Sequence, residues 1–228
     1  MNKINSKVAL DLLLKDVINN KGDLEKPENR WVKHCIFVGA GAYRIAFKLG
    51  VDADYAQAMG YIHDIGRKIS HPNHTIDGYH YMIDNGFSEE ARSCLTHSFI
   101  DNNIYYTAGG IPEGQDRFDY INAFLLSTDV TIFDNIVQMC DLFCLETGFT
   151  TIERRLLDIT KRKGAFDNSL LHFEKTMELK DRLEQQMGCC LYDLFPEIDP
   201  VALENIDKDR AELLELLKPK NEHILAKK

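Results

Sequence analysis

Histidines and aspartates that recur through the first part of the chain are the residues best suited to chemistry. The doublet His63-Asp64 stands at the centre of this set. The whole set consists of His34, His63, Asp64, His74, His97 and Asp141. Imidazole nitrogens and carboxylate oxygens are the ligands that divalent transition metals take in proteins. Because burying so many polar side chains is costly without a cation, the set predicts a hydrolytic metal site.

Each residue of this set also has a purely structural interpretation. A single histidine on an apolar helix face is usually a hydrogen-bonded core residue, and a buried aspartate usually pairs with arginine or lysine. These interpretations stay open for each of the residues taken singly. Their joint occurrence on inward-facing sides of predicted helices favours the metal site.

The last carboxylate of the set has two rivals, Asp129 and Asp134. We choose Asp141 because its predicted helix face is apolar, and a carboxylate without a partner would be costly there. The residues that share this face are Val137, Cys140 and Cys144. Asp134 is better explained as the cap at the start of the same helix.

The elements that must position these residues are helices. Apolar residues recur with helical periodicity, and no run of alternating β-branched residues predicts a strand. We therefore predict an all-α protein. The predicted helices cover about 5–19, 29–49, 52–65, 73–85, 88–99, 118–126, 134–144, 150–163, 168–187 and 199–217.

Several helix ends carry recognisable signals. Asp52 is predicted to cap a helix start, Gly66 to stop a helix, and Thr150 with Glu153 to form a capping box. Between these helices, glycine, proline and asparagine residues predict a long polar loop over 100–117, a length at which loops are often functional.

The composition is that of an ordinary soluble protein, with a hydrophobic share of 44% and a charged share of 28% in 228 residues. No apolar run approaches the roughly 18 residues of a membrane span, and no signal-peptide core is present at the start. The net charge of −9 argues against broad binding of nucleic acid or anionic membranes. The six cysteines lack zinc-finger spacing, so we expect reduced thiols in a cytoplasmic protein.

The order of His34, His63-Asp64 and Asp141 resembles the HD superfamily of metal-dependent phosphohydrolases, over about residues 29–145. The resemblance implies an all-α, HD-type helical domain with additional C-terminal helices. We accordingly expect three parts along the chain. They are an N-terminal helix and linker over 1–28, the HD domain with its metal site over 29–165, and a helical extension packed on it over 166–228.

Two further features sharpen the resemblance. His74 and His97 resemble the additional histidines of a subset with a binuclear centre, to which the HD-type symmetrical diadenosine tetraphosphate hydrolases belong. The stretch 133–141, followed by Gly148 and Glu153-Arg154-Arg155, is similar to uncharacterised bacterial HD hydrolases.

The resemblance implies a role for each residue of the set. One divalent ion would be held by His34, His63, Asp64 and Asp141, and a second by His74 and His97 with Asp64 bridging, so we expect a mono- or binuclear centre with one or two ions. A ligand set without thiolate favours iron, manganese, cobalt or nickel, while magnesium and zinc are also compatible.

The catalytic residues implied are Asp64, Arg67 and Lys68. Many HD proteins carry lysine three residues after the aspartate, where this chain has Arg67 followed by Lys68. Arginine stays charged and can bind phosphate through two nitrogens, which suits it to stabilising charge on phosphoryl oxygens.

The expected function is metal-dependent hydrolysis of a nucleotide or another small phosphoester, with no nucleic acid or membrane as partner. Two alternatives stay open: a di-iron oxygenase of the HD type, and a catalytically silent module that binds metal or nucleotide. A homodimer is also compatible with the sequence.

Overall fold

The computed structural model describes residues 3–19 and 23–225. Helices make up nearly all of the regular structure in these residues, and a two-stranded sheet of β1 (Cys144–Leu145) and β2 (Gly148–Phe149) is the rest. The all-α prediction is confirmed. Within the described part of the chain, no helix is both long and apolar enough to cross a membrane.

The chain forms two compact units. Unit 1 consists of Met1–His97 and Val130–Gly148, and unit 2 consists of Ser98–Asp129 and Phe149–Lys228. Both units are therefore discontinuous in sequence. The division of the chain at residues 28 and 165 stays a prediction.

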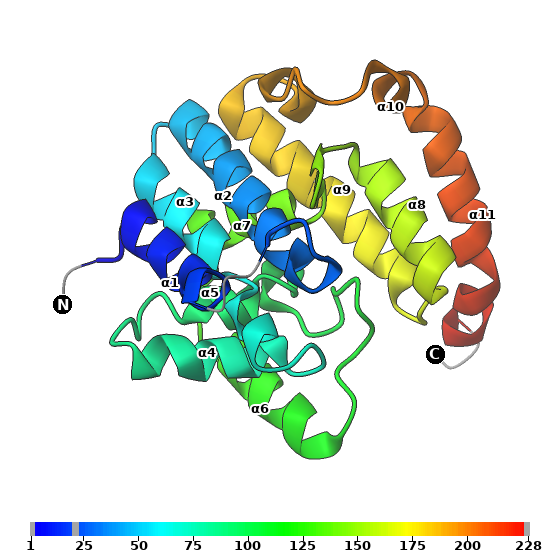
Figure 1. Cartoon of the computed structure of the whole chain (residues 1–228). Helices are drawn as coiled ribbons and strands as arrows, with labels where there is room; N and C mark the ends of the chain where they lie inside the picture. The colour runs from blue at the N-terminus through cyan, green and yellow to red at the C-terminus, as the bar shows by residue number, and fades with distance from the viewer. Residues whose placement is uncertain (1–2, 20–22, 226–228) are drawn as a thin grey trace. The chain divides into compact units, whose positions relative to one another are not determined.

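Unit 1 is built around the pair α2 and α3, which run alongside each other, with α1 packed on α3 (Figure 1). Glycine allows the closest approach within the pair, because a Cβ on Gly60 would lie 2.7 Å from the Cα of Gly39. The elements of unit 1 are α1 (Ser6–Asn19), η1 (Pro27–Asn29), α2 (Arg30–Leu49), α3 (Ala53–Ile62), η2 (Ile65–Lys68), α4 (His74–Asp84), α5 (Arg92–Thr96) and α7 (Ile132–Asp141), with β1 following.

Local signals explain where the central pair ends and begins. Gly50 closes α2 in the left-handed conformation with φ of 72°, which glycine adopts without strain. Asp52 then caps α3 as predicted, since its side chain accepts a hydrogen bond from the backbone N–H of Tyr55. The inward face of α2 is apolar. It buries Val32, Cys35, Val38, Ala42, Ile45 and Ala46.

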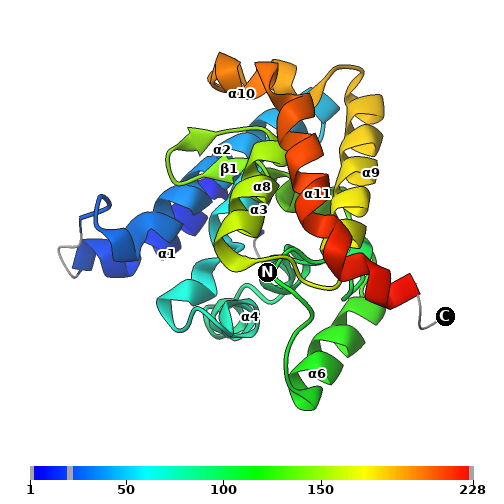
Figure 2. The same cartoon turned by 90° about the vertical axis from the view of Figure 1, so that its right-hand side faces the viewer.

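In unit 2, α11 lies along α8 and also contacts α9 (Figure 2). A buried carboxylate joins these parts: Glu153 of α8 accepts hydrogen bonds from the Tyr192 hydroxyl at 3.0 Å and from Arg210 Nη2 at 2.6 Å. The elements of unit 2 are η3 (Ile100–Asn102), α6 (Gln115–Leu126), α8 (Ile152–Lys163), α9 (Ser169–Met187), η4 (Leu191–Leu194), α10 (Pro200–Glu204) and α11 (Ile206–Leu225).

Several predicted helix ends are wrong. Thr151, not Thr150, caps α8, and its side chain accepts from the N–H of Arg154, while Glu153 turns to Tyr192 and Arg210. The last helix is two helices, because α10 ends at Glu204 and α11 starts at Ile206.

The predicted loop over 100–117 is also shorter than expected. Its start holds the short helix η3, and its end belongs to α6, which begins at Gln115. Beyond residue 217, where the last predicted helix ends, α11 continues as far as Leu225, and residues 226–228 lie outside the described part.

Candidate metal centre

All six predicted metal ligands lie in unit 1, where they form two groups of three. The first group is His34, His63 and Asp141, and the second group is Asp64, His74 and His97. Within each group, one ligand atom from every residue lies within 4.8 Å of the other two. The spacing is suited to a cation in each group.

The first group joins three helices. His34 lies in the second turn of α2, His63 directly follows α3, and Asp141 ends α7. His34 Nε2 lies 2.8 Å from Asp141 Oδ1, and His63 Nε2 lies 3.9 Å from the same oxygen. The two imidazole rings meet edge to face, with centroids 5.3 Å apart.

The second group gathers around one oxygen of Asp64. Oδ1 of this carboxylate lies 3.2 Å from His74 Nε2 and 3.5 Å from His97 Nε2. The other oxygen, Oδ2, lies 3.8 Å from His63 Nε2, in the first group. One oxygen of Asp64 thus faces the second group, and the other lies between His63 of the first group and Arg67, whose Nε donates to it.

Backbone carbonyls set which nitrogen of three histidines carries the proton. The Nδ1 atoms of His63, His74 and His97 lie at hydrogen-bond distance from the carbonyl oxygens of Gly60 (2.7 Å), His71 (2.9 Å) and Ser93 (3.1 Å). A carbonyl oxygen can only accept, so in each neutral ring Nδ1 is the donor and Nε2 keeps its lone pair. Ligand histidines are commonly oriented in this way.

Because these Nε2 atoms keep their lone pairs, they and the carboxylate oxygens of Asp64 are hydrogen-bond acceptors that face one another. His63 is completely buried and Asp64 is 2% exposed, yet His63 Nε2 and Asp64 Oδ1 have no hydrogen-bond partner. Buried polar atoms without a partner are rare in native proteins and call for a specific explanation. A cation among these atoms supplies one.

Burial keeps three of the histidines neutral. It lowers the pKa of His63, and it lowers the pKa values of His74 and His97 to about 4 each. Burial acts to raise the pKa of Asp64, but the positive charge that the imidazoles carry once protonated, together with that of the Arg67 guanidinium, outweighs it and holds that pKa well below its usual range. Neutral imidazoles beside an ionised carboxylate are the protonation states that bind metal.

The basic residues after the doublet are in different surroundings. Arg67 lies at the edge of the second group, where its Nε donates to Asp64 Oδ2 and its Nη1 donates to His71 Nδ1 at 3.3 Å. Its side chain is 30% exposed and can be reached by a solute. Lys68 donates to the Tyr81 hydroxyl at 3.2 Å and lies over that ring, so its catalytic role stays a prediction.

Gly66 has a different role from the predicted helix stop. It lies inside η2, and a Cβ at this position would overlap the His74 carbonyl and the backbone of Gly78. The missing side chain therefore lets η2 pack directly on α4. This contact brings the segment that carries Asp64 next to the first residue of α4, His74.

Asp134, the rival of Asp141, does not point into either group. The predicted cap is corrected, because Thr131 is the N-cap of α7 and Asp134 is the third helical residue of a capping box. Asp134 also pairs with Arg92, whose Nη2 lies 2.7 Å from Oδ2. Sequence reasoning missed this ion pair, which links residues distant in the chain.

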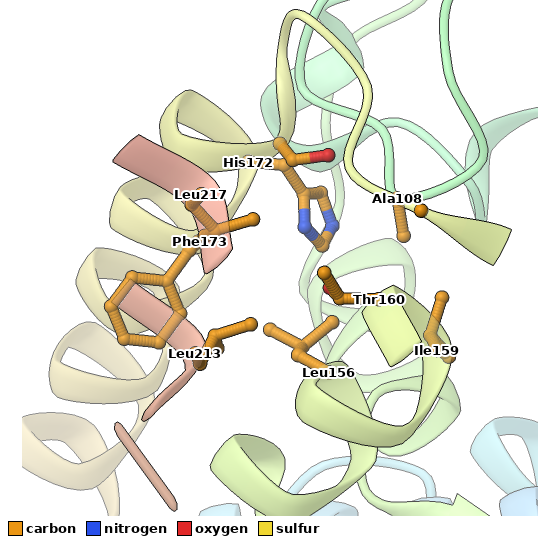
Figure 3. Close-up of a pocket in the computed structure, with 10 residues that line it drawn as sticks. Ala108, Leu156, Ile159, Thr160, His172, Phe173, Leu213 and Leu217 are labelled. Atoms are coloured by element: carbon orange, nitrogen blue, oxygen red, sulfur yellow. The ribbon is translucent and has the colours of Figure 1, made fainter. Parts of the chain in front are cut away.

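Unit 2 contains a small cavity between α8, α9 and α11, into which the imidazole of His172 points (Figure 3). Its volume is about 20 Å³, enough for a water molecule but not for a substrate. The lining is mostly apolar and includes Leu156, Ile159, Phe173, Leu213 and Leu217. The candidate site for chemistry therefore remains the two groups in unit 1.

Comparison with known proteins agrees with this location. Residues 31–141 match the protein family described as the HD domain. The matched segment begins just before the first ligand and ends at the last. No curated protein and no solved structure matches the chain.

Proposed function

We propose, from the match of residues 31–141 to the HD domain family, that the protein is a metal-dependent phosphohydrolase that acts on a nucleotide or another small phosphoester. One observation carries the proposal: lone pairs of two neutral imidazoles, the half-buried His74 and the buried His97, converge on an ionised carboxylate that has an oxygen without a partner. Such a set of acceptors is suited to one or two divalent cations.

Divalent ions at these groups would polarise a phosphoryl oxygen and lower the pKa of a coordinated water, which is the chemistry of phosphoester hydrolysis. The chain's own residues provide the geometry. His63, His74 and His97 are held by backbone carbonyls, so their Nε2 atoms are oriented before any ligand arrives. Such preorganisation reduces the reorganisation that binding and catalysis require.

Arg67 is the residue that we assign to the phosphate. Its guanidinium is charged at all relevant pH values, and it lies beside Asp64 with part of its surface exposed. A phosphoryl group bound near the two ligand groups would therefore also lie close to the positive charge of Arg67. Arg67 would stabilise the negative charge that develops on the phosphoryl oxygens.

The buried thiols support the choice of metals. Burial raises the pKa values of Cys35 and Cys140, which neighbour His34 and Asp141 in the chain, so both thiols stay protonated and are poor ligands. The donors that remain are nitrogen and oxygen. We propose iron, manganese, cobalt or nickel as the bound metal, with magnesium and zinc also compatible.

We also propose a small phosphorylated partner, with a nucleotide as the favoured class, and neither nucleic acid nor a membrane. The net charge of −9 supports this, because a polyanion would be repelled by most of the surface. A cytoplasmic location is supported by the six cysteines, which form no disulfide bond within the described residues.

The test is elemental analysis of the purified protein, followed by a screen of nucleotides and phosphoesters with added manganese or iron under anaerobic conditions. We expect one or two transition metal ions per chain, and hydrolysis without dioxygen. The double variant His63→Ala, Asp64→Ala should lose both metal and activity. His80→Ala is the control, because this histidine is exposed on α4.

Intact metal content in the double variant would rule out the assigned site. Turnover that requires dioxygen would indicate the di-iron oxygenase, and tight nucleotide binding without turnover would indicate the silent module.

A further inference from the structure

Asp134 is a buried carboxylate with more hydrogen bonds than a helix cap requires. Its Oδ2 accepts from the backbone N–H of Thr131 at 2.7 Å and from the hydroxyl of the same residue at 2.6 Å. Arg92 donates to both oxygens, and the Thr96 hydroxyl donates to Oδ1 at 2.8 Å. The carboxylate is only 2% exposed. Capping alone would be served by an exposed residue.

The additional partners belong to α5, the helix that leads to His97. This helix has five residues, and no side chain caps its N-terminus. Because short helices are marginal by themselves, α5 depends on tertiary contacts for its position. Arg92 and Thr96 are its first and last residues, so Asp134 holds both ends.

Gln138 adds a second contact one turn later along α7. Its Nε2 donates to the carbonyl oxygen of Thr96 at 3.0 Å, and both residues are buried. Thr96 directly precedes His97, so this bond fixes the peptide that carries the ligand. Residues 134, 138 and 141 are spaced by four and three, which places them on one face of α7.

This face of α7 therefore serves both ligand groups. Asp141 enters the first group, while Asp134 and Gln138 hold the segment that brings His97 into the second. We propose that Asp134 and Gln138 are positioning residues, which hold Thr96 and thereby fix His97 at its distance from Asp64. This inference rests on the proposed function, because it presupposes that the second group binds a metal.

The test removes one hydrogen bond with little change in volume. Gln138→Met keeps an unbranched side chain of similar size and deletes the donor to Thr96. We expect the first equivalent of Mn²⁺ to bind as in the unaltered protein and the second to bind roughly 10- to 100-fold more weakly, the usual effect of losing a residue that orients a ligand. Calorimetric titration of metal-free protein with Mn²⁺ measures both steps.

Asn168→Leu is the matched control. In unit 2, the buried amide of Asn168 donates to the carbonyl oxygens of Tyr105 and Thr107, at 3.0 Å and 2.7 Å. Its replacement removes a comparable set of bonds far from the ligands in sequence, so thermal stability should fall while both Mn²⁺ steps are retained. Asp134→Asn is the second variant, and it should weaken the second step as Gln138→Met does.

Two results would overturn the inference. The first leaves the proposed function intact, and the second also excludes the binuclear centre. If the unaltered protein binds two Mn²⁺ and Gln138→Met binds both with equal affinity, the positioning role is wrong and the proposed function stands. If the unaltered protein binds no Mn²⁺ in the second group, both the positioning role and the binuclear centre are wrong.

Discussion

At the scale of single residues, the tautomers of the histidines decide what the site can bind. An imidazole whose Nδ1 donates to a backbone carbonyl cannot also donate from Nε2 while it is neutral. His74 and His97 both have this arrangement, and both direct Nε2 at Asp64 Oδ1. A nitrogen lone pair directed at an ionised carboxylate oxygen is unfavourable unless a cation lies between the two atoms. The arrangement therefore favours ligands over packing residues.

The difference between a metal ligand and a packing residue leads to a prediction for His74→Ala and His97→Ala. Each should lower the metal-to-protein ratio by about one ion and reduce phosphoester hydrolysis by several orders of magnitude, because the second cation helps to stabilise the transferred phosphoryl group. Elemental analysis and steady-state kinetics measure the two effects. His80→Ala is again the control. A variant with lower thermal stability but an unchanged metal ratio would show that the two histidines only pack.

At the scale of elements, direct backbone contact sets the distance between ligands. Gly66 in η2 and Gly78 in α4 touch without side chains between them, and a Cβ on Gly78 would lie 3.0 Å from the N of Gly66. The ligands Asp64 and His74 lie on the two segments that meet here. A change of packing at this contact is therefore transmitted to the second ligand group.

Gly66→Ala should accordingly destabilise the fold by about 1–3 kcal/mol, as expected for an overpacked contact, and weaken binding of the second metal. Urea unfolding and Mn²⁺ titration measure these effects. Gly109→Ala is the control, since a Cβ there would meet only Thr107 Oγ1 at 4.0 Å and its φ is not positive. Equal stability of the two variants would show that the contact between η2 and α4 can relax.

The sequence predicts helices and ligand residues better than it predicts helix ends. Periodicity locates α2 and the start of α3 closely, because the apolar face of α2 is long and Gly50 and Asp52 mark these boundaries, but α3 ends at Ile62 and not near residue 65. It fails for α8, where Thr150 and Thr151 are equally good caps by type and only the fold selects Thr151. It also fails for Glu153, because Tyr192 and Arg210, the partners that bury it, are distant in sequence.

The six candidate ligands can be named from the sequence, because naming them requires only the residue types and the helix faces on which these residues lie. The residues around them could not be named in this way. The roles of Asp134 and Gln138 depend on where α5 lies against α7, and helical periodicity does not contain that information. The sequence does show that Asp134, Gln138 and Asp141 are spaced by four and three residues. This spacing does not identify their roles, because many surface residues of helices share it.

At the scale of the whole molecule, the site concentrates groups that respond to pH. Burial lowers the pKa values of His74 and His97 from 6.5 to about 4. Between these two values the unfolded chain binds more protons than the folded one, so the free energy of unfolding decreases as pH falls through this window. The low pKa of Asp64 acts in the same direction, because that carboxylate also resists protonation when folded.

Chelator-treated protein should therefore show a lower urea midpoint at pH 4 than at pH 6.5, and His74→Gln should reduce this dependence. Urea titrations at a series of pH values, with constant ionic strength, measure it. The exposed His80 provides the control variant, His80→Gln. A midpoint that does not change with pH in this window would mean that these imidazoles are not held neutral by the fold.

The discontinuity of unit 1 has a consequence for how the protein is made. On the ribosome, Met1–His97 is synthesised first, and Val130–Gly148 follows only after Ser98–Asp129. A nascent chain that ends before Val130 already carries every ligand except Asp141, but it lacks α7 and therefore the contacts that fix α5. Such a chain carries candidate metal ligands without a finished centre. Under the proposed function, we therefore expect the metal to bind only after α7 has been translated.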